Sequence, residues 1–487
     1  MNPELRRYLW TEFSLGRVIF MPVILGLVLL LFGVWTFDST EPGGGEEFLE
    51  SFVATGTIGY ILVVLFWGSR IAAAAMVREI ADKTWDQQRL SSMGAWGMTW
   101  GKLFGSTSYV WYGCGLLLAV ALISLGLIEA HYGAVSEEMG RDVGTVMLQL
   151  VLGLAALTVL IESCVMLIAM TAVSRRNSAR QLDVTIAQAV VIITSLVLFS
   201  MMNDMQDDTQ VVWFGHLIDA TWFAVGSTIM FAAWAVVGLW RRMRLELQMP
   251  NRPLMWSVFV LFAGAWLAGL AVGPGKDDAV TLTAVIMTIT AMVLTYVPAV
   301  LERMDPVNLR RLVASVRGGR VGSILSDAPV WVINHGLALL GLVLSVILLL
   351  SQQPSQADQT ADLFSELDMT GFAPGTLVAA WLFITRDLML LVFAWLGRNT
   401  RRAFTTWLIW MVVLYALAPM IVAALGAHAV LPAFVPAWDV PFVHLGISPL
   451  VWPALEIVVV AGLVRWRWRR FAASAVETKA EAVKNPQ

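Results

Sequence analysis

Long apolar stretches separated by short polar segments dominate the chain, and this pattern predicts membrane-spanning helices. A helix that crosses a bilayer needs about 20 mostly apolar residues. Applied along the sequence, this length gives about twelve candidate spans, so we expect an all-α polytopic membrane protein. Their approximate ranges are 18–37, 52–72, 106–128, 144–173, 184–202, 217–240, 254–272, 279–301, 329–350, 374–396, 407–427 and 448–464.

The composition agrees with a bilayer as the surrounding solvent. Of 487 residues, 58% are hydrophobic and only 14% are charged, and the mean hydropathy is +0.74. A soluble protein carries roughly 25% charged residues. The polar segments between the spans are too short to form an independent soluble core. We therefore expect an integral membrane protein, of the bacterial cytoplasmic (inner) membrane.

The basic residues orient these spans. If the N-terminus lies in the cytoplasm, nearly all of the 32 Lys and Arg residues fall in cytoplasmic segments. The exceptions are Arg141 and Lys276 on the outside and Arg386 within a span. Cytoplasmic loops are enriched in Lys and Arg, so this bias supports the span map and places both termini in the cytoplasm.

Twelve spans with both termini on one side suggest two fused six-helix halves, 1–245 and 246–472, followed by a polar cytoplasmic tail, 473–487. Parallel repeats of this kind are a known transporter layout. In each half the longest cytoplasmic segment follows the second span, at 73–105 and at 302–328.

The first of these cytoplasmic segments predicts a short surface helix. Thr84-Trp85-Asp86-Gln87 has the form of a capping box, in which a Thr hydroxyl and a Gln side chain satisfy free amides. We expect a helix that begins near Trp85 and is broken by Gly94 and Gly97, with return to the membrane at Lys102. An exposed aromatic residue on such a helix indicates lipid or protein as its partner.

This segment resembles the loop after the second span of ABC-2 type permeases of ATP-binding cassette transporters. Glu79, Thr84, Leu90 and Gly101-Lys102 stand at the positions of that loop motif, although Lys83 and Met93-Gly94 replace its usual Gly and Pro. The N-terminal MNPELRRYLWTEFSLGR is similar to the family's amphipathic elbow helix, and the resemblance is clearest over residues 1–240.

The resemblance implies a permease subunit whose short helix, the coupling helix, docks on an ABC-type ATPase subunit at the cytoplasmic face. The chain lacks the P-loop pattern GxxxxGK[ST], so ATP and Mg²⁺ are expected in that partner and no cofactor in this chain. Export is the expected direction, and a homodimer is possible. The coupling residues would be Glu79, Thr84, Trp85, Asp86, Gln87, Arg89 and Leu90.

A second candidate for a coupling helix lies in the other half, at 305–325. This segment is basic and amphipathic, so a helix that lies on the membrane surface is an equal alternative. The basic residues of the chain are spread over many segments, which fits topology and anionic lipid rather than nucleic acid.

Charged residues within predicted spans form the other candidate site. Charges at mid-bilayer are costly and commonly face protein or water. Arg386 and Glu456 have similar predicted depths, so an ion pair between them is feasible, and Asp387 adjoins it. These residues indicate either a substrate path or helix–helix pairing. Glu162 has no obvious cationic neighbour, so it is either a functional group or a protonated acid.

Two other classes of function stay open. One is a secondary transporter, for example of the twelve-span major-facilitator layout, but the loop after the second span lacks that family's signature GxxxD[RK]xG[RK][RK]. A non-transporting membrane assembly subunit is the second alternative. Nucleophile or metal motifs such as GxSxG and HExxH are absent, so we do not expect an enzyme.

Overall fold

A computed structural model shows a helical protein that divides into two compact units. Unit 1 comprises Met1–Val211 and Ile218–Asn251, and unit 2 comprises Val212–Leu217 and Arg252–Gln487. Each unit is described by itself. The structure describes residues 2–36, 44–82, 84–90, 93–133, 141–176, 181–203, 210–249, 251, 253–273, 279–302, 306–319, 322, 328–351, 374–397, 402–427, 431, 434 and 450–484.

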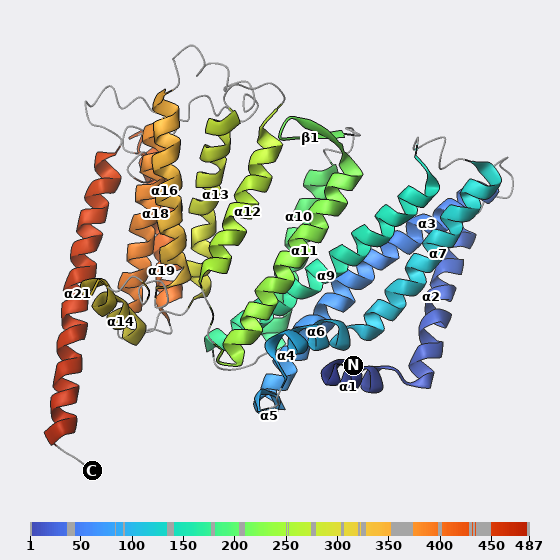
Figure 1. The fold of residues 1–487 in the computed structure, drawn as a ribbon, viewed down its shortest axis with the longest axis horizontal. Coiled ribbons are helices and arrows are strands. Elements are labelled where there is room, and N and C mark those ends of the chain that lie inside the picture. Colours follow the sequence, from blue (N-terminus) through green and yellow to red (C-terminus); the bar gives the residue numbers. More distant parts are fainter. Residues whose placement is uncertain are drawn as a thin grey trace. The chain divides into compact units, whose positions relative to one another are not determined.

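Unit 1 is built from long helices with three short ones at one end (Figure 1). The short helices are α1 (Pro3–Glu12), α5 (Thr84–Arg89) and α6 (Ala95–Ser106). The long helices are α2 (Leu15–Thr36), α3 (Gly44–Leu62), η1 (Val63–Gly68) continuing into α4 (Ser69–Ala81), α7 (Ser108–Tyr132), α9 (Val143–Arg176), α10 (Gln181–Asn203) and α11 (Ala220–Glu246).

Helix α9 is central to the packing of unit 1. It packs against α4, α10 and α11, while α3 packs against α7 and α2. Small and medium apolar residues such as Ala72, Val165 and Ala169 fill the interior and are fully buried. The outward face of α2 instead exposes large apolar residues, among them Leu27 and Leu31. Apolar residues on both faces of a helix are expected where lipid replaces water.

Unit 2 contains a second set of long helices and its own apolar core. Helix α13 packs against α12 and α16, and α18 packs against α16, α19 and α21. The elements are α12 (Leu254–Ala271), α13 (Ala279–Leu301), α14 (Pro306–Arg317), α16 (Val330–Ser351), α18 (Pro374–Trp395), α19 (Ala403–Val412), η4 (Val413–Leu417), α20 (Ala418–Ala424) and α21 (Val451–Lys484).

Between α10 and α11 the chain forms a small hairpin. Strands β1 (Gln210–Trp213) and β2 (His216–Asp219) make a two-stranded sheet. Its turn contains Phe214 and Gly215, both with positive φ. The carboxylate of Asp219 then accepts a hydrogen bond from the backbone amide of Trp222 at the start of α11. It also forms an ion pair with Arg141. The hairpin is therefore tied to the beginning of α11.

Ten helices within the described residues are long and apolar enough to cross a membrane. This count treats Gly45–Ala81 as one helix and Ala403–Ala424 as another. The result supports an integral, all-α membrane protein.

Two of the twelve predicted spans are not among the ten. In α10 the apolar stretch that is described covers only Leu182–Leu196. Helix α21 carries Glu456, Arg465 and Arg467 in its first half, so its apolar stretch is interrupted. Twelve spans, the fusion of two halves and the side of the termini therefore stay predictions.

Candidate functional site

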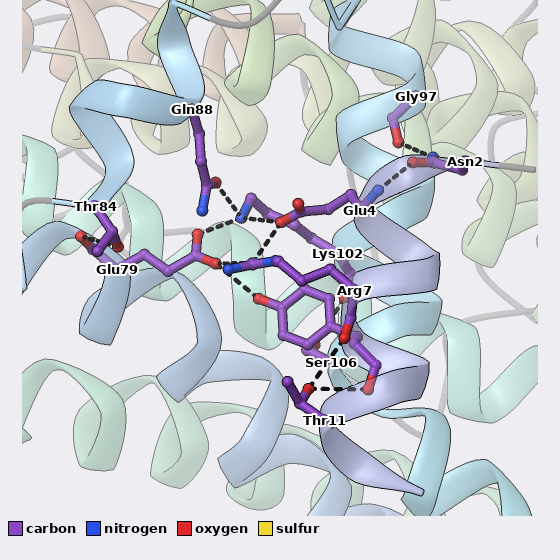
Figure 2. A network of polar contacts seen from close by, with 11 residues as sticks. Asn2, Glu4, Arg7, Thr11, Glu79, Thr84, Gln88, Gly97, Lys102 and Ser106 are labelled. Carbon is purple, nitrogen blue, oxygen red and sulfur yellow. Dashed lines mark hydrogen bonds and ion pairs between the residues drawn. The ribbon is translucent and has the colours of Figure 1, made fainter.

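A buried lysine joins four helices at one end of unit 1 (Figure 2). The side chain of Lys102 in α6 is fully buried. Its Nζ atom lies 3.0 Å from Oε1 of Glu4 in α1 and also bonds Oε2 of Glu79 in α4. A third hydrogen bond, 2.8 Å long, reaches Oε1 of Gln88 in α5. All three ammonium protons therefore have acceptors.

Two neighbouring residues of α1 complete this network. Nη2 of Arg7 lies 2.6 Å from Oε1 of Glu79 and 2.7 Å from Oε1 of Glu4. The hydroxyl of Tyr8 donates to Oε1 of Glu79 over 2.8 Å. Burial and the adjacent charge of Glu79 raise the pKa of the Tyr8 phenol well above its usual range, so it stays a donor. Two carboxylates thus face two cations, which offsets part of the cost of burying them.

Three glycines allow α1 to approach α6 closely. Gly97, Gly101 and Gly105 are spaced four residues apart, so they share one face of α6. A Cβ atom at Gly101 would lie 2.7 Å from Cβ of Glu4, and one at Gly105 would lie 2.7 Å from Cδ2 of Tyr8. Small residues at this spacing let helices touch along their backbones. The same stripe was readable in the sequence but was not recognised there.

The predicted short helix exists as α5, but its start differs from the predicted capping box. The helix begins at Thr84, and the Thr84 hydroxyl donates to the carbonyl oxygen of Glu79 over 3.2 Å. This bond fastens α5 back onto the end of α4. Lys83, at the junction, lies outside the described residues.

Trp85 is buried, contrary to the sequence expectation of an exposed aromatic residue. Only 4% of its surface is exposed, and its ring lies 5.3 Å from Nζ of Lys102. A cation over an aromatic ring is attracted to the negative face of the ring. Trp85 therefore connects α5 to Lys102 of α6, and its predicted role in coupling stays a prediction.

The outward surface of α5 and the turn after it is formed by other predicted residues. Leu90 is 89% exposed, and Thr84 and Gln87 are also exposed. Helix α5 includes Asp86 and Arg89, whose side chains lie outside the described set, as do Ser91 and Ser92. An apolar side chain as exposed as Leu90 has lost the favourable transfer free energy that burial would supply.

One further expectation about this segment was wrong. Gly94 does precede a new helix, but Gly97 lies inside α6 and does not break it. Lys102 is fully buried in the network with Glu4 and Glu79, and its position at the return to the membrane stays a prediction. The error at Gly97 arises because α6 is a separate helix covered by α1, which is distant in sequence.

In unit 2 the predicted ion pair between Arg386 and Glu456 is present. Nη1 of Arg386 in α18 lies 2.6 Å from Oε2 of Glu456 in α21. Nε of Arg386 also donates to Oδ1 of Asp387 over 2.9 Å. Arg386 is 1% exposed, whereas the side chain of Glu456 is 27% exposed. The pair joins α18 to α21, which supports helix pairing as one of the two predicted readings.

Asp387 also accepts hydrogen bonds from aromatic side chains of other elements. Its Oδ2 atom accepts from the hydroxyls of Tyr296 in α13 and Tyr415 in η4, over 2.7 Å and 2.6 Å. Its backbone carbonyl accepts from Nε1 of Trp407 in α19 over 2.9 Å. Residue 387 therefore links three elements to α18. The sequence indicated the charges but not these aromatic donors, which come from separate helices.

Glu162 is fully buried in α9 and lacks a cationic partner among the described residues. Its Oε2 atom is 3.0 Å from Oγ1 of Thr107 and 3.2 Å from Nε1 of Trp111. Its Oε1 atom has no hydrogen-bond partner within the described part of the chain. The sequence expectation of an isolated carboxyl group is consistent with this geometry.

The second coupling candidate, 305–325, contains helix α14 (Pro306–Arg317). Parts of this range lie outside the described residues, among them Asp305 and Arg320. Glu302 lies at the start of the segment 302–328, as Glu79 lies near the start of 73–105. Its carboxylate, however, accepts a hydrogen bond from the backbone amide of Val330 at the start of α16. The two acidic residues thus differ in their contacts, and both readings of 305–325 remain predictions.

Among the described residues, no group of three or more His, Cys, Asp and Glu side chains is placed to hold a metal ion. No family model, curated protein or solved structure matches this chain.

Proposed function

We propose that this chain is the membrane-spanning permease subunit of an ABC transporter, and that a separate ATPase subunit docks on α5. The observation that carries the proposal is the division of α5 into two sides. Trp85 and Gln88 face Lys102, whereas Leu90, directly after the helix, is 89% exposed. A partner that binds the exposed side, at Leu90, would also move the side on which Trp85 and Gln88 contact Lys102.

The network gives such a movement a route into unit 1. Lys102 bonds side chains of α1, α4 and α5, and α4 continues through η1 into the long helix α3. Coupling through contiguous packed elements is a recognised means of transmitting a conformational change. ATP and Mg²⁺ would be bound by the partner, and this chain would form the translocation pathway.

The test is co-purification of the full-length chain from its native membranes. We expect an ATP-hydrolysing subunit with a P-loop to accompany it, and Leu90→Asp to reduce that association and the associated ATP hydrolysis at least tenfold. An aspartate would place a charge where an apolar contact is expected.

Leu217→Asp is the matched control, because Leu217 is 68% exposed and lies in strand β2, at the predicted outer end of the sixth span. It should leave the association unchanged. Wild-type protein without an associated ATPase, or equal loss in both variants, would refute docking at α5.

A further inference from the structure

A buried carboxyl group in the middle of α9 can be assigned a protonation state by counting hydrogens. The group is Glu162, which is fully buried and lies near the centre of a 34-residue helix. An ionised carboxylate accepts hydrogen bonds but donates none. The donors around Oε2 therefore decide whether Glu162 is ionised.

The hydroxyl proton of Thr107 determines which of these oxygen atoms has a donor. Its Oγ1 atom lies 2.6 Å from the carbonyl oxygen of Leu103 and 3.0 Å from Oε2 of Glu162. A threonine hydroxyl has one proton, so it can donate to only one of these two oxygens.

The shorter contact takes that proton. Leu103 is among the last four residues of α6, whose carbonyls lack the usual helical amide donors. The backbone amide of Thr107 is directed to Gly105 instead. Donation from Thr107 to Leu103 satisfies this carbonyl, and leaves two oxygens, Oγ1 and Oε2, 3.0 Å apart without a proton from Thr107.

From this count we infer that Glu162 is a neutral carboxylic acid that binds a proton inside unit 1 and donates it to Oγ1 of Thr107. The acid proton supplies the missing hydrogen, and Nε1 of Trp111 donates to the same carboxyl oxygen over 3.2 Å. Neutrality also avoids placing an unpaired charge within a helix that is long and apolar enough to span a membrane, which would be costly.

Within the part of the chain that the structure describes, Glu162 forms no ion pair with a cation. The titratable groups that interact with it are Cys114 of α7 and Tyr60 of α3, and neither is basic. On the packed helices α4 and α6, Arg70 is exposed and directed to Gln188, and Lys102 is bound to Glu4 and Glu79. Among the described groups, the proton is the one positive partner that the geometry supplies.

The free oxygen of the carboxyl group faces a π-helix. A Cβ atom at Gly68, the last residue of η1, would lie 3.4 Å from Oε1 of Glu162. Single π-helical turns occur frequently at functional sites. The proton-binding site thus lies against the least regular turn of this long helix, and it holds whether or not an ATPase binds the chain.

The test is infrared spectroscopy of the full-length protein in detergent at pH 7, with the carbonyl-stretch band of a protonated carboxylic acid as the readout. We expect this band in the wild type, its loss in Glu162→Gln and its retention in Glu246→Gln. Glu246 forms an ion pair with Arg242, and it serves as the control. Absence of the band from the wild type, or its persistence in Glu162→Gln, would overturn the inference.

A second comparison decides the case if Glu162→Gln does not fold. Thr107→Val removes the acceptor of the acid proton and should shift the band, whereas Thr107→Ser keeps a hydroxyl and should leave it in place. A band that is unmoved by Thr107→Val would also contradict the assignment.

Discussion

The Nζ atom of Lys102 lies 3.0 Å from Oε1 of Glu4, although 98 residues separate them in the chain. This contact holds the N-terminal helix α1 against α6. Because Glu79 bonds the same ammonium group, the end of α4 is part of the same structure. The buried charges are mutually dependent, since removal of one leaves its partners without compensation.

Lys102→Met should therefore destabilise the protein strongly. Removing one partner of a buried ion pair costs about 3–5 kcal/mol, and two carboxylates lose their partner here. Thermal unfolding in detergent measures the effect. Arg17→Met is the control, because Arg17 pairs with Glu12 at an exposed site and such pairs contribute about 0–1 kcal/mol. Equal losses in both variants would argue against a buried network.

Gly101→Ala should weaken the packing of α1 on α6. Its Cβ atom would lie 2.7 Å from Cβ of Glu4, and overpacking of this kind costs about 1–3 kcal/mol. At Gly115 of α7 there is nothing within 4 Å of an added Cβ. Gly115→Ala should therefore be neutral or stabilising, because alanine favours helix. The shifts in unfolding temperature caused by the two substitutions should differ in sign or size. Identical shifts would contradict the close approach of α1 to α6.

Tyr415→Phe should lower the free energy of unfolding more than Tyr112→Phe does. Tyr415 donates to the carboxylate of Asp387, and hydrogen bonds to charged groups contribute about 1.5–3 kcal/mol. Tyr112 donates to the neutral backbone carbonyl of Val18, a contribution of about 0.5–1.5 kcal/mol. Denaturant unfolding of both variants makes the comparison. A larger loss in Tyr112→Phe would contradict this ranking of the two hydrogen bonds.

Gln188→Leu should loosen the π-helix η1. Nε2 of Gln188 in α10 donates to the carbonyl oxygen of Phe66 over 2.7 Å, and it also reaches Oγ of Ser69. Loss of these bonds should accelerate hydrogen exchange of the η1 amides. Gln149→Leu is the control, because Nε2 of Gln149 is buried without a hydrogen-bond partner in the described structure. That variant should exchange like the wild type, and equal acceleration in both would refute the role of Gln188.

Several features followed directly from the order of residues. Apolar runs of span length predicted helices, and the described structure has ten that are long and apolar enough to cross a membrane. The reason is physical, since a backbone in lipid must satisfy its own hydrogen bonds and helices do so within one segment. The similar depths of Arg386 and Glu456 predicted their pairing, which is present.

Other features depended on contacts between distant segments, and the sequence pattern did not determine them. Trp85 was expected to be exposed because its local neighbours are polar, yet Lys102 and α6 cover it. The burial of Lys102 likewise depends on Glu4 and Glu79, which lie on two other helices and supply its partners.

The sequence by itself determined where helices form, because the length and polarity of each run decide its solvent. Only the tertiary structure decided which polar groups are paired and which are alone. Arg386 and Glu162 both lie within predicted spans, but Arg386 meets Glu456, whereas Glu162 meets only neutral hydroxyl and indole groups among the described residues. That difference arises from the faces that neighbouring helices present, which no local pattern encodes.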